Sequence, residues 1–532
     1  MCGQKNSYKW AALFLILVSF NNFALANKVI YVDDDAAGAN DGSSWQNAYN
    51  FLQDALADAN TAEKPVEIHV AQGIYKPDQG EGQTAGDRNA AFRLINDVTL
   101  SGGFAGILKS DPNKQNIEEY ETVLSGDLAG NDIEINDPDK LLEEPTRSEN
   151  SLTIIWGAHT DSTSLLDGFT IKGGNNNIIT EIPIGSGLSI LSGKSTITNC
   201  TFSYNSGAPA LRNTRSDPLI TNCRFYYNFI GMTNDHSNAT ITYCNFSKNR
   251  VAIELISCDN LIVTKCQFTE NYGNFGGAIY NYRSVLTLKD CSFTKNSSYN
   301  SPTKGGGNGG AIYNTGGTLI LTNCFFIGNY AEGKGAGIYT LGYNLTLINC
   351  TFATNISKDG TALACESMTN ISSISNCILW NDGNEIWYKG SSISVDYSDV
   401  KGGLSSIYDP NNGLIWGDRN IFTDPLFADP NKYDYHLKSQ SGRWYPNNQT
   451  WIKDDVTSPC IDAGDPNSPI GYEPFPNGGY INMGVYGGTS EASKSYFGMP
   501  ICETIVAGDI NGDCKVDELD MEIMMLHWLE EH

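Results

Sequence analysis

The chain is 532 residues long and acidic: 34 Lys and Arg stand against 60 Asp and Glu, which gives a formal net charge of −26 at pH 7. This charge argues against binding nucleic acid or an anionic membrane through bulk electrostatics. It also disfavours acidic polysaccharides as ligands unless Ca²⁺ or a local basic patch mediates the contact.

The first 26 residues have the pattern of a secretory signal peptide. Lys5 and Lys9 precede an apolar run from Trp10 to Phe20, and Ala24-Leu25-Ala26 forms a small-x-small cleavage site. The run is too short to anchor the chain in a membrane, and no later stretch is long and apolar enough to span a bilayer. The sequence therefore predicts a protein that is secreted, or displayed at the cell surface or outer membrane.

Residues 27–90 are predicted to form a strand and a capping helix. Apolar residues recur at helical spacing at Ala48, Leu52, Ala55, Leu56 and Ala59. Ser43 or Ser44 is placed to cap the start of the helix, and the alternation of Val66, Ile68 and Val70 predicts a strand after it. We expect the helix to cover the open end of the structure that follows.

A repeat dominates the middle of the chain. Eight copies place a cysteine, an apolar residue two positions on, and an asparagine at the end of the unit, with successive cysteines 21 to 33 residues apart. The cysteines are Cys200, Cys223, Cys244, Cys266, Cys291, Cys324, Cys350 and Cys377. A period in this range is typical of a solenoid, in which each unit buries its apolar edge by stacking on its neighbours.

Each unit contains two short strands that meet at a corner. Apolar residues occur three residues before each cysteine and resume at the cysteine itself, which breaks a period of two and requires a turn. Asn or Asp often occupies that turn, because both tolerate the left-handed conformation of a tight corner. A second corner carries a predicted asparagine ladder formed by Asn205, Asn228, Asn249, Asn271, Asn296, Asn329, Asn355 and Asn381.

A third short segment completes the coil at residues 276–281, 309–314 and 335–339, so three strands per turn predict a parallel β-helix. The Gly-Gly-Ala-Ile segments, alternating with Phe-x-x-Asn from Phe268 and Phe293, resemble the polymorphic outer-membrane protein repeat. The wider similarity, over roughly residues 150–400, is to right-handed parallel β-helix proteins of the pectate-lyase-like group. The resemblance implies an all-β, right-handed parallel β-helix solenoid over residues 91–400, with irregular first coils.

The 14 cysteines of an exported protein raise the question of disulfides. Equivalent positions in neighbouring coils are about 4.8 Å apart, whereas a disulfide needs Cβ atoms near about 3.8 Å. We therefore predict an inward stack of free thiols along the repeat. Pairing of Cys460, Cys502 and Cys514 stays open, and the absence of a Cys-x-x-Cys pair disfavours metal binding by cysteine.

Residues 401–498 are loop-rich and aromatic. Asp424-Pro425-Leu426-Phe427 and residues 433–437, 458–464 and 482–488 resemble the C-terminal region of secreted bacterial β-helix proteins that carry surface-anchoring tails. This resemblance implies closing coils and a C-terminal cap, and no reaction.

Residues 499–532 hold an EF-hand-type calcium loop followed by a short apolar-striped helix. The predicted ligands are Asp509, Asn511, Asp513, Lys515 through its backbone carbonyl, Asp517 and Asp520. The segment resembles one half of a dockerin module, although Cys514 replaces the usual glycine and no second loop follows. The resemblance implies calcium as cofactor and attachment to a cohesin-like protein or the cell surface; a solvated acidic turn is the alternative.

No catalytic signature of pectate lyases or polygalacturonases occurs in the repeats. The nearest polar group comprises Asp235, His236, Arg250 and Asp259, with Arg212, Arg215 and Glu254 on neighbouring coils. Paired carboxylates beside a base could support elimination or hydrolysis of a glycan. Solvated surface residues are the alternative.

Three functions therefore remain open. The first is a non-catalytic, secreted or surface-displayed protein that binds polysaccharides or cell-surface glycans. The second is a polysaccharide lyase or glycoside hydrolase, and the third is a structural cell-envelope protein. Sugar stacking or core packing are the alternatives for Trp380, Trp387, Trp416, Trp444 and Trp451.

Overall fold

The structure is a computed structural model that describes residues 28–178, 184–303, 305–342, 344–366, 372–390 and 392–496, with positions 516, 518 and 521. The predicted signal peptide and all six predicted calcium ligands lie outside the described residues. In the described part, no helix is long and apolar enough to cross a membrane.

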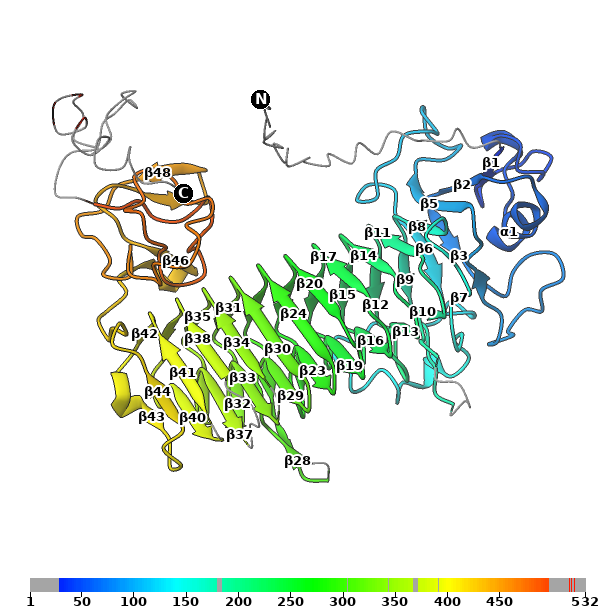
Figure 1. The fold of residues 1–532 in the computed structure, drawn as a ribbon. Helices are drawn as coiled ribbons and strands as arrows, with labels where there is room; N and C mark the ends of the chain where they lie inside the picture. Colours follow the sequence, from blue (N-terminus) through cyan, green and yellow to red (C-terminus); the bar gives the residue numbers. More distant parts are fainter. Residues whose placement is uncertain are drawn as a thin grey trace, which may run out of the picture.

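The body of the molecule is a right-handed parallel β-helix of three long sheets, so the predicted fold class is confirmed. Figure 1 shows the strands stacked in successive coils along one axis. Each coil passes in turn through sheets A, B and C.

Sheet A has 14 strands: β1 (Lys28–Val32), β2 (Val66–Ala71), β5 (Val98–Phe104), β8 (Leu165–Asp167), β11 (Thr196–Thr198), β14 (Leu219–Thr221), β17 (Thr240–Thr242), β20 (Leu261–Thr264), β24 (Val285–Lys289), β30 (Thr318–Thr322), β34 (Leu345–Ile348), β38 (Ser372–Ser375), β41 (Ile393–Asp396) and β44 (Leu414–Trp416). Sheet B has 12: β3 (Gly73–Tyr75), β6 (Thr122–Ser125), β9 (Thr170–Lys172), β12 (Thr201–Ser203), β15 (Arg224–Tyr226), β18 (Asn245–Ser247), β21 (Gln267–Thr269), β25 (Ser292–Thr294), β31 (Phe325–Ile327), β35 (Thr351–Ala353), β39 (Ile378–Trp380) and β42 (Asp399–Val400).

Sheet C also has 12 strands: β4 (Phe92–Arg93), β7 (Ile155–Ala158), β10 (Leu188–Leu191), β13 (Leu211–Thr214), β16 (Met232–Asp235), β19 (Ile253–Ile256), β23 (Ile279–Tyr282), β29 (Ile312–Thr315), β33 (Ile338–Leu341), β37 (Leu363–Glu366), β40 (Ile386–Lys389) and β43 (Ile407–Tyr408). A short fourth sheet at the corner between sheets B and C contains β22 (Tyr272–Gly273), β26 (Ser297–Ser298), β32 (Tyr330–Lys334) and β36 (Ile356–Asp359). The antiparallel pairs are β27 (Asn300–Ser301) with β28 (Gly305–Gly306), β45 (Phe427–Asp429) with β46 (Asp434–Leu437), and β47 (Arg443–Tyr445) with β48 (Thr450–Ile452).

Columns of identical side chains fill the interior. All eight repeat cysteines are at most 1% exposed and carry free thiols, so the predicted inward cysteine stack is confirmed. A column of phenylalanines runs beside it from Phe202 to Phe352, with neighbouring ring centroids 4.4–5.1 Å apart in stacked geometry. One repeated choice of residue thus packs every coil in the same way, because each coil presents the next with the same surface.

The two predicted corners are also confirmed. Asn199, Asn222, Asp290, Asn323, Asn349 and Asn376 take φ values of 51–55°, the left-handed conformation expected at the first corner. At the second corner the eight ladder asparagines are at most 1% exposed. From Asn205 to Asn355, each backbone N–H and each Nδ2 donates to the Oδ1 of the next asparagine at 2.8–3.1 Å.

The N-terminal end carries the helix α1 (Leu52–Thr61), seen at that end in Figure 1. Its buried residues Leu52, Ala55, Leu56 and Ala59 join the solenoid core. Ser44 caps a separate 3₁₀ turn, η1 (Trp45–Asn47), by accepting from the Asn47 backbone N–H, so the expectation that it caps the helix is wrong. The parallel sheets already begin at β1, and α1 connects the first two strands of sheet A.

Three further 3₁₀ turns occur in the described residues, η2 (Pro145–Arg147), η3 (Gly403–Ser406) and η4 (Pro430–Lys432).

Beyond β44 the chain folds back along the solenoid instead of continuing it. Residues 427–496, here called the C-terminal lobe, lie beside the last coils, as the positions of β46 and β48 in Figure 1 show. Phe427, Tyr435, Cys460 and Met483 of the lobe pack on the outer side of sheet B.

Candidate functional site

The predicted polar group is partly assembled on the outer face of sheet C. Asp235, at the end of β16, lies 2.7 Å from Arg212 Nη2 and 2.8 Å from His236 Nδ1. The Arg212 side chain is 10% exposed, whereas that of His236 is 62% exposed. Asp235 and His236 are therefore in contact, as the hypothesis of a shared site requires.

The other two members of the predicted group lie elsewhere. Arg250 pairs with Asp139 at 2.9 Å and lies over the Phe229 ring, 4.8 Å from its centroid. The backbone N–H of Asp259 donates to Asn238 Oδ1 at 3.0 Å. Within the described residues, no hydrogen bond or ion pair joins Arg250 or Asp259 to Asp235.

Glu254 occupies the neighbouring strand, in register with Thr233 and Arg212. Burial raises the pKa of Glu254, and a hydrogen bond from Thr233 Oγ1 at 3.1 Å partly offsets this shift. The same outward column continues through five aromatic residues, Tyr280, Tyr313, Tyr339, Trp387 and Tyr408, with Ala364 between Tyr339 and Trp387.

The aromatic column is packed within itself. Tyr313 stacks on Tyr280 at 5.8 Å and on Tyr339 at 5.0 Å, and Lys334 Nζ lies 3.5 Å from the centre of the Trp387 ring. Because stacked rings present their edges outward, this face offers few free ring faces for a sugar. The column therefore acts mainly in packing, which is also the role of Trp387.

A large cleft lies where the C-terminal lobe meets the corner between sheets A and B. Its volume is about 1170 Å³. The floor comes from four successive coils, through residues 264–267, 289–292, 322–323 with Phe325, and 348–349. The wall comes from residues 468–469, 471–472 and 485–491 with Ile481. At about 4.8 Å per coil, the floor extends along the helix axis by about 14 Å.

The lining of this cleft mixes polar, charged and aromatic side chains. Lys265, Gln267 and Lys289 are exposed on the floor, and Tyr472, at 83% exposure, lies on the wall. Burial raises the pKa of Asp290, and the charges of Lys289 and Lys265 offset part of the shift. The two lysines form a local basic pair in an otherwise acidic chain.

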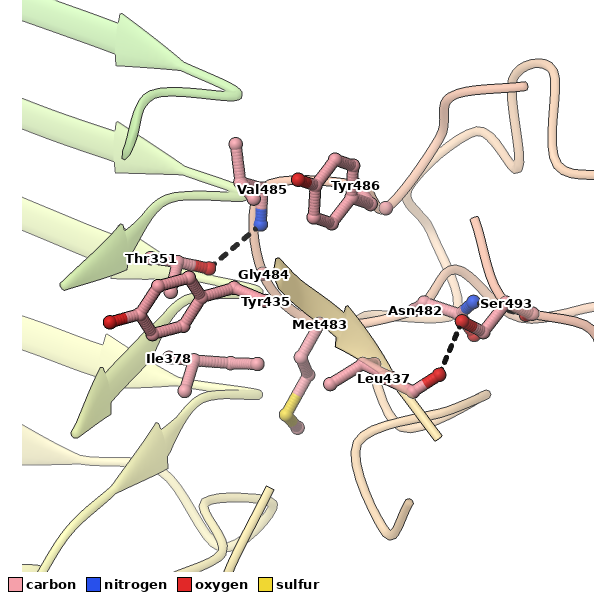
Figure 2. Close-up of a pocket in the computed structure, with 11 residues that line it drawn as sticks. Thr351, Ile378, Tyr435, Leu437, Asn482, Met483, Gly484, Val485, Tyr486 and Ser493 are labelled. Atoms are coloured by element: carbon pink, nitrogen blue, oxygen red, sulfur yellow. Dashed lines mark hydrogen bonds between the residues drawn. The ribbon is translucent and has the colours of Figure 1, made fainter. Parts of the chain in front are cut away.

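Backbone groups of the lobe hold the wall against the floor. Asn323 Nδ2 donates to the carbonyl oxygens of Val485 and Gly487, both at 2.8 Å. Figure 2 shows the adjoining contact, in which the Val485 N–H donates to Thr351 Oγ1 at 2.9 Å while Met483 and Tyr435 lie near Ile378. The corner asparagines thus act both as turn residues and as anchors for the lobe.

Behind the wall, a buried histidine supports Tyr486. The His436 ring lies 3.7 Å from the Tyr486 ring in stacked geometry. Its Nδ1 lies 2.7 Å from Asp434 Oδ1, and its Nε2 faces Glu491 Oε2 at 3.4 Å. Burial lowers the pKa of His436, but the two carboxylates outweigh burial and leave the pKa above its ordinary value.

Neither this cleft nor the ion pair of His436 was predicted from the sequence. The wall and floor are separated by more than 100 residues in the chain, and no local sequence pattern indicates their contact. The alternation of Asp434 and His436 on one strand was the available signal for the ion pair.

One family match agrees with the fold. The family described as right-handed β-helix region matches residues 154–284 and 229–400, and the family described as disaggregatase related matches residues 409–464. No curated protein matches the chain.

Solved structures with similarity to this chain include pectate lyase Pel9A, at 13% identity and a TM-score of 0.40, covering 86% of this chain and 96% of that one. The catalytic unit of the GH87 α-1,3-glucanase of Streptomyces thermodiastaticus strain HF3-3 is similar at 12% identity and a TM-score of 0.30, covering 73% of this chain and 66% of that one. The tailspike gp49 of Acinetobacter baumannii bacteriophage Fri1, a capsular polysaccharide depolymerase, is similar at 11% identity and a TM-score of 0.33, covering 80% of this chain and 69% of that one.

Proposed function

We propose that this protein is a secreted or surface-displayed polysaccharide-binding protein whose ligand lies in the cleft between the C-terminal lobe and the corner of sheets A and B. The shape and the lining of the cleft are the main support for this proposal. It is open, follows the helix axis over four coils, and combines amide, lysine and tyrosine side chains. A concave site of this size with a few convergent polar groups is the usual form of a ligand site.

The lining suits an extended, hydroxyl-rich polymer. The exposed Tyr472 offers an aromatic ring with a polar tip, a combination suited to the apolar face and hydroxyl groups of a sugar. Gln267 and Ser292 add hydrogen-bonding groups on the floor. Lys265 and Lys289 provide the local basic patch that an acidic polysaccharide needs on a chain of net negative charge.

The proposal also includes how the protein is held in place. The predicted signal peptide would export it, and the predicted calcium loop from Asp509 to Asp520 would attach it to a cohesin-like protein or the cell surface through a dockerin-like tail. Both features are supported by sequence pattern alone.

An enzymatic function is the second candidate, and it rests on Asp235. This carboxylate contacts both a guanidinium and an exposed imidazole, and Glu254, whose pKa burial raises, lies on the neighbouring strand. Such a group is equipped for a lyase or glycoside hydrolase reaction. This alternative predicts reducing ends or unsaturated products from some glycan, lost in a D235N/H236N variant; the third candidate, a structural envelope protein, predicts neither binding nor products.

The decisive experiment measures binding and products in parallel. The mature protein is titrated with neutral and acidic polysaccharides in the presence of Ca²⁺, and released ends are assayed. We expect binding without products, weakened about tenfold, or about 1.4 kcal/mol, by Tyr472→Ala and by Lys289→Ala. Tyr408→Ala on sheet C is the matched control, because its side chain is also exposed but lies away from the cleft lining; equal loss in the control, or no binding to any polymer, overturns the proposal.

A further inference from the structure

The long connection between β6 and β7 contains a second acidic cluster, unrelated to the predicted calcium tail. Asp127, Asp132 and Glu149 each offer a carboxylate oxygen, and these oxygens lie within 4.8 Å of one another. Asp127 and Asp132 belong to one loop, in which the Gly130, Asn131 and Asp132 N–H groups donate to the Asp127 carboxylate. Glu149 approaches from the end of the same connection.

Several oxygens at this cluster are buried without a hydrogen-bond partner. They are Asp132 Oδ1 and Glu149 Oε1, and Oδ1 of the neighbouring Asn150 is also without a partner. Asn150 is fully buried, and its Nδ2 donates to Asp132 Oδ2 at 2.9 Å and to the Gly173 carbonyl oxygen at 2.6 Å, so its amide nitrogen faces the cluster. A buried carboxylate oxygen that accepts no hydrogen bond costs free energy because it has lost its hydration, and a bound cation would offset that cost.

The three carboxylates of the cluster carry more charge than the two nearby arginines, Arg147 and Arg88, so the local net charge is negative. Arg147, at 2% exposure, places Nη1 2.7 Å from Asp132 Oδ2. Arg88 lies nearby but donates to the carbonyl oxygens of Asn150 and Asn175. The pKa of Asp132 is raised to about 6, mainly by burial and also by the carboxylates of Asp127 and Glu149, against the opposing effects of Arg147 and Asn150.

We propose that Asp127, Asp132 and Glu149 bind a calcium ion through their carboxylate oxygens, beside the buried Asn150 amide that donates to Asp132. An all-oxygen ligand set with several carboxylates is the chemistry that Ca²⁺ prefers, and Ca²⁺ accepts the irregular geometry that a folded loop supplies. Zn²⁺ is disfavoured because the set has no nitrogen or sulfur ligand. Mg²⁺ is disfavoured because it requires near-ideal octahedral geometry and retains water.

Residues 126–150, here called the strap, run from this cluster along the corner between sheets B and C and cross several coils. The proposed ion would hold the base of the strap in place. Tyr204 Oη donates to Glu134 Oε1 at 2.6 Å and lies 3.0 Å from Asn136 Oδ1. Asp139 pairs with Arg250, which lies two coils beyond Tyr204. Calcium binding at the base of the strap should therefore stabilise its contacts with the coils beneath it.

The test uses the full mature chain carrying Asp509→Ala and Asp513→Ala, which removes the predicted tail site. After chelator treatment, calorimetric titration with CaCl₂ should show one Ca²⁺ per chain, and Ca²⁺ should raise the Tm and protect residues 126–150 from proteolysis. Glu149→Gln in this background should weaken binding at least tenfold while leaving the Asp132–Arg147 pair intact. Glu143→Gln, an exposed acid on the same strap, is the matched control and should bind as the background does.

Three outcomes would overturn the assignment. The background protein binds no Ca²⁺; or Glu149→Gln binds as tightly as Glu143→Gln; or MgCl₂ produces the same heat and the same protection as CaCl₂. Because the first measurement uses the unaltered cluster, the result does not depend on whether a cluster variant folds.

Discussion

Asn381 directs both of its donors at a single carboxylate: its backbone N lies 2.6 Å from Glu385 Oε1, and its Nδ2 lies 2.7 Å from Oε2. Asn381 is the last asparagine of the ladder that begins at Asn205. In the ladder, the amide oxygen of each asparagine from Asn228 to Asn381 accepts hydrogen bonds from the backbone N–H and Nδ2 of the asparagine one coil earlier. Glu385 is therefore the terminal acceptor of the column, and it is itself fully buried.

Replacing Glu385 with Ala should destabilise the last coils. Two buried N–H groups of Asn381 would lose their acceptor, and each unsatisfied buried group costs about 1–3 kcal/mol. We expect the free energy of unfolding to fall by about 2–4 kcal/mol, measured by urea denaturation. Asp382→Ala is the control, because this side chain is 98% exposed and its pair with Lys401 is worth less than about 1 kcal/mol; a similar loss in both variants would contradict the role of Glu385.

The stability of the protein should decrease from pH 5 to pH 8. Burial raises the pKa of Glu385, Asp399 and Glu473 each to about 7, against partly compensating hydrogen bonds. A carboxyl group with a raised folded-state pKa stabilises the fold fully below its unfolded pKa, near 4, and loses that contribution as pH rises through 7. Urea midpoints measured across this range test the direction; Glu385→Gln should flatten the dependence, and a stability maximum above pH 8 would contradict the prediction.

Substituting an interior ladder residue, Asn271→Ala, should cost about 2–4 kcal/mol. Asn271 Oδ1 accepts from the backbone N–H and Nδ2 of Asn249, and its own Nδ2 donates to the Phe246 carbonyl at 2.8 Å. Removing the side chain leaves these buried groups without partners. Asn245→Ala is the matched control, since Asn245 bonds outward to Gln267 on the surface and should change stability by less than about 0.5 kcal/mol.

The solenoid was predictable because each of its constraints is local and repeated. The cysteine, the corner asparagine and the ladder asparagine each indicate the conformation of their own coil. Because the pattern occurs in eight copies, it predicts the repeated coil. The polar group of Asp235 and His236 was found because the two residues are adjacent in sequence. Arg250 and Asp259 were placed with them on period alone, which fixes the coil but not the corner on which a side chain lies.

Local and repeated sequence patterns do not predict the cleft or the strap. The cleft forms because the lobe returns to coils about 130–160 residues earlier in the chain, as the Asn323–Val485 contact shows. The strap depends on a cluster whose members, Asp132 and Glu149, meet only when the insertion folds against the first coils. Neither arrangement leaves a periodic trace in the sequence.

The free thiols give a direct chemical test of the solenoid. All eleven cysteines in the described part are free and buried, and burial raises the pKa of Cys365 and Cys460 above its ordinary value. A buried, protonated thiol is a poor nucleophile. In a mature Cys502→Ser/Cys514→Ser variant, we therefore expect iodoacetamide to modify none of them in the native state at pH 8, and all eleven after unfolding without a reductant. Mass spectrometry of the intact chain counts the adducts; fewer than eleven in the unfolded protein would reveal disulfides, and labelling in the native state would contradict an inward cysteine column.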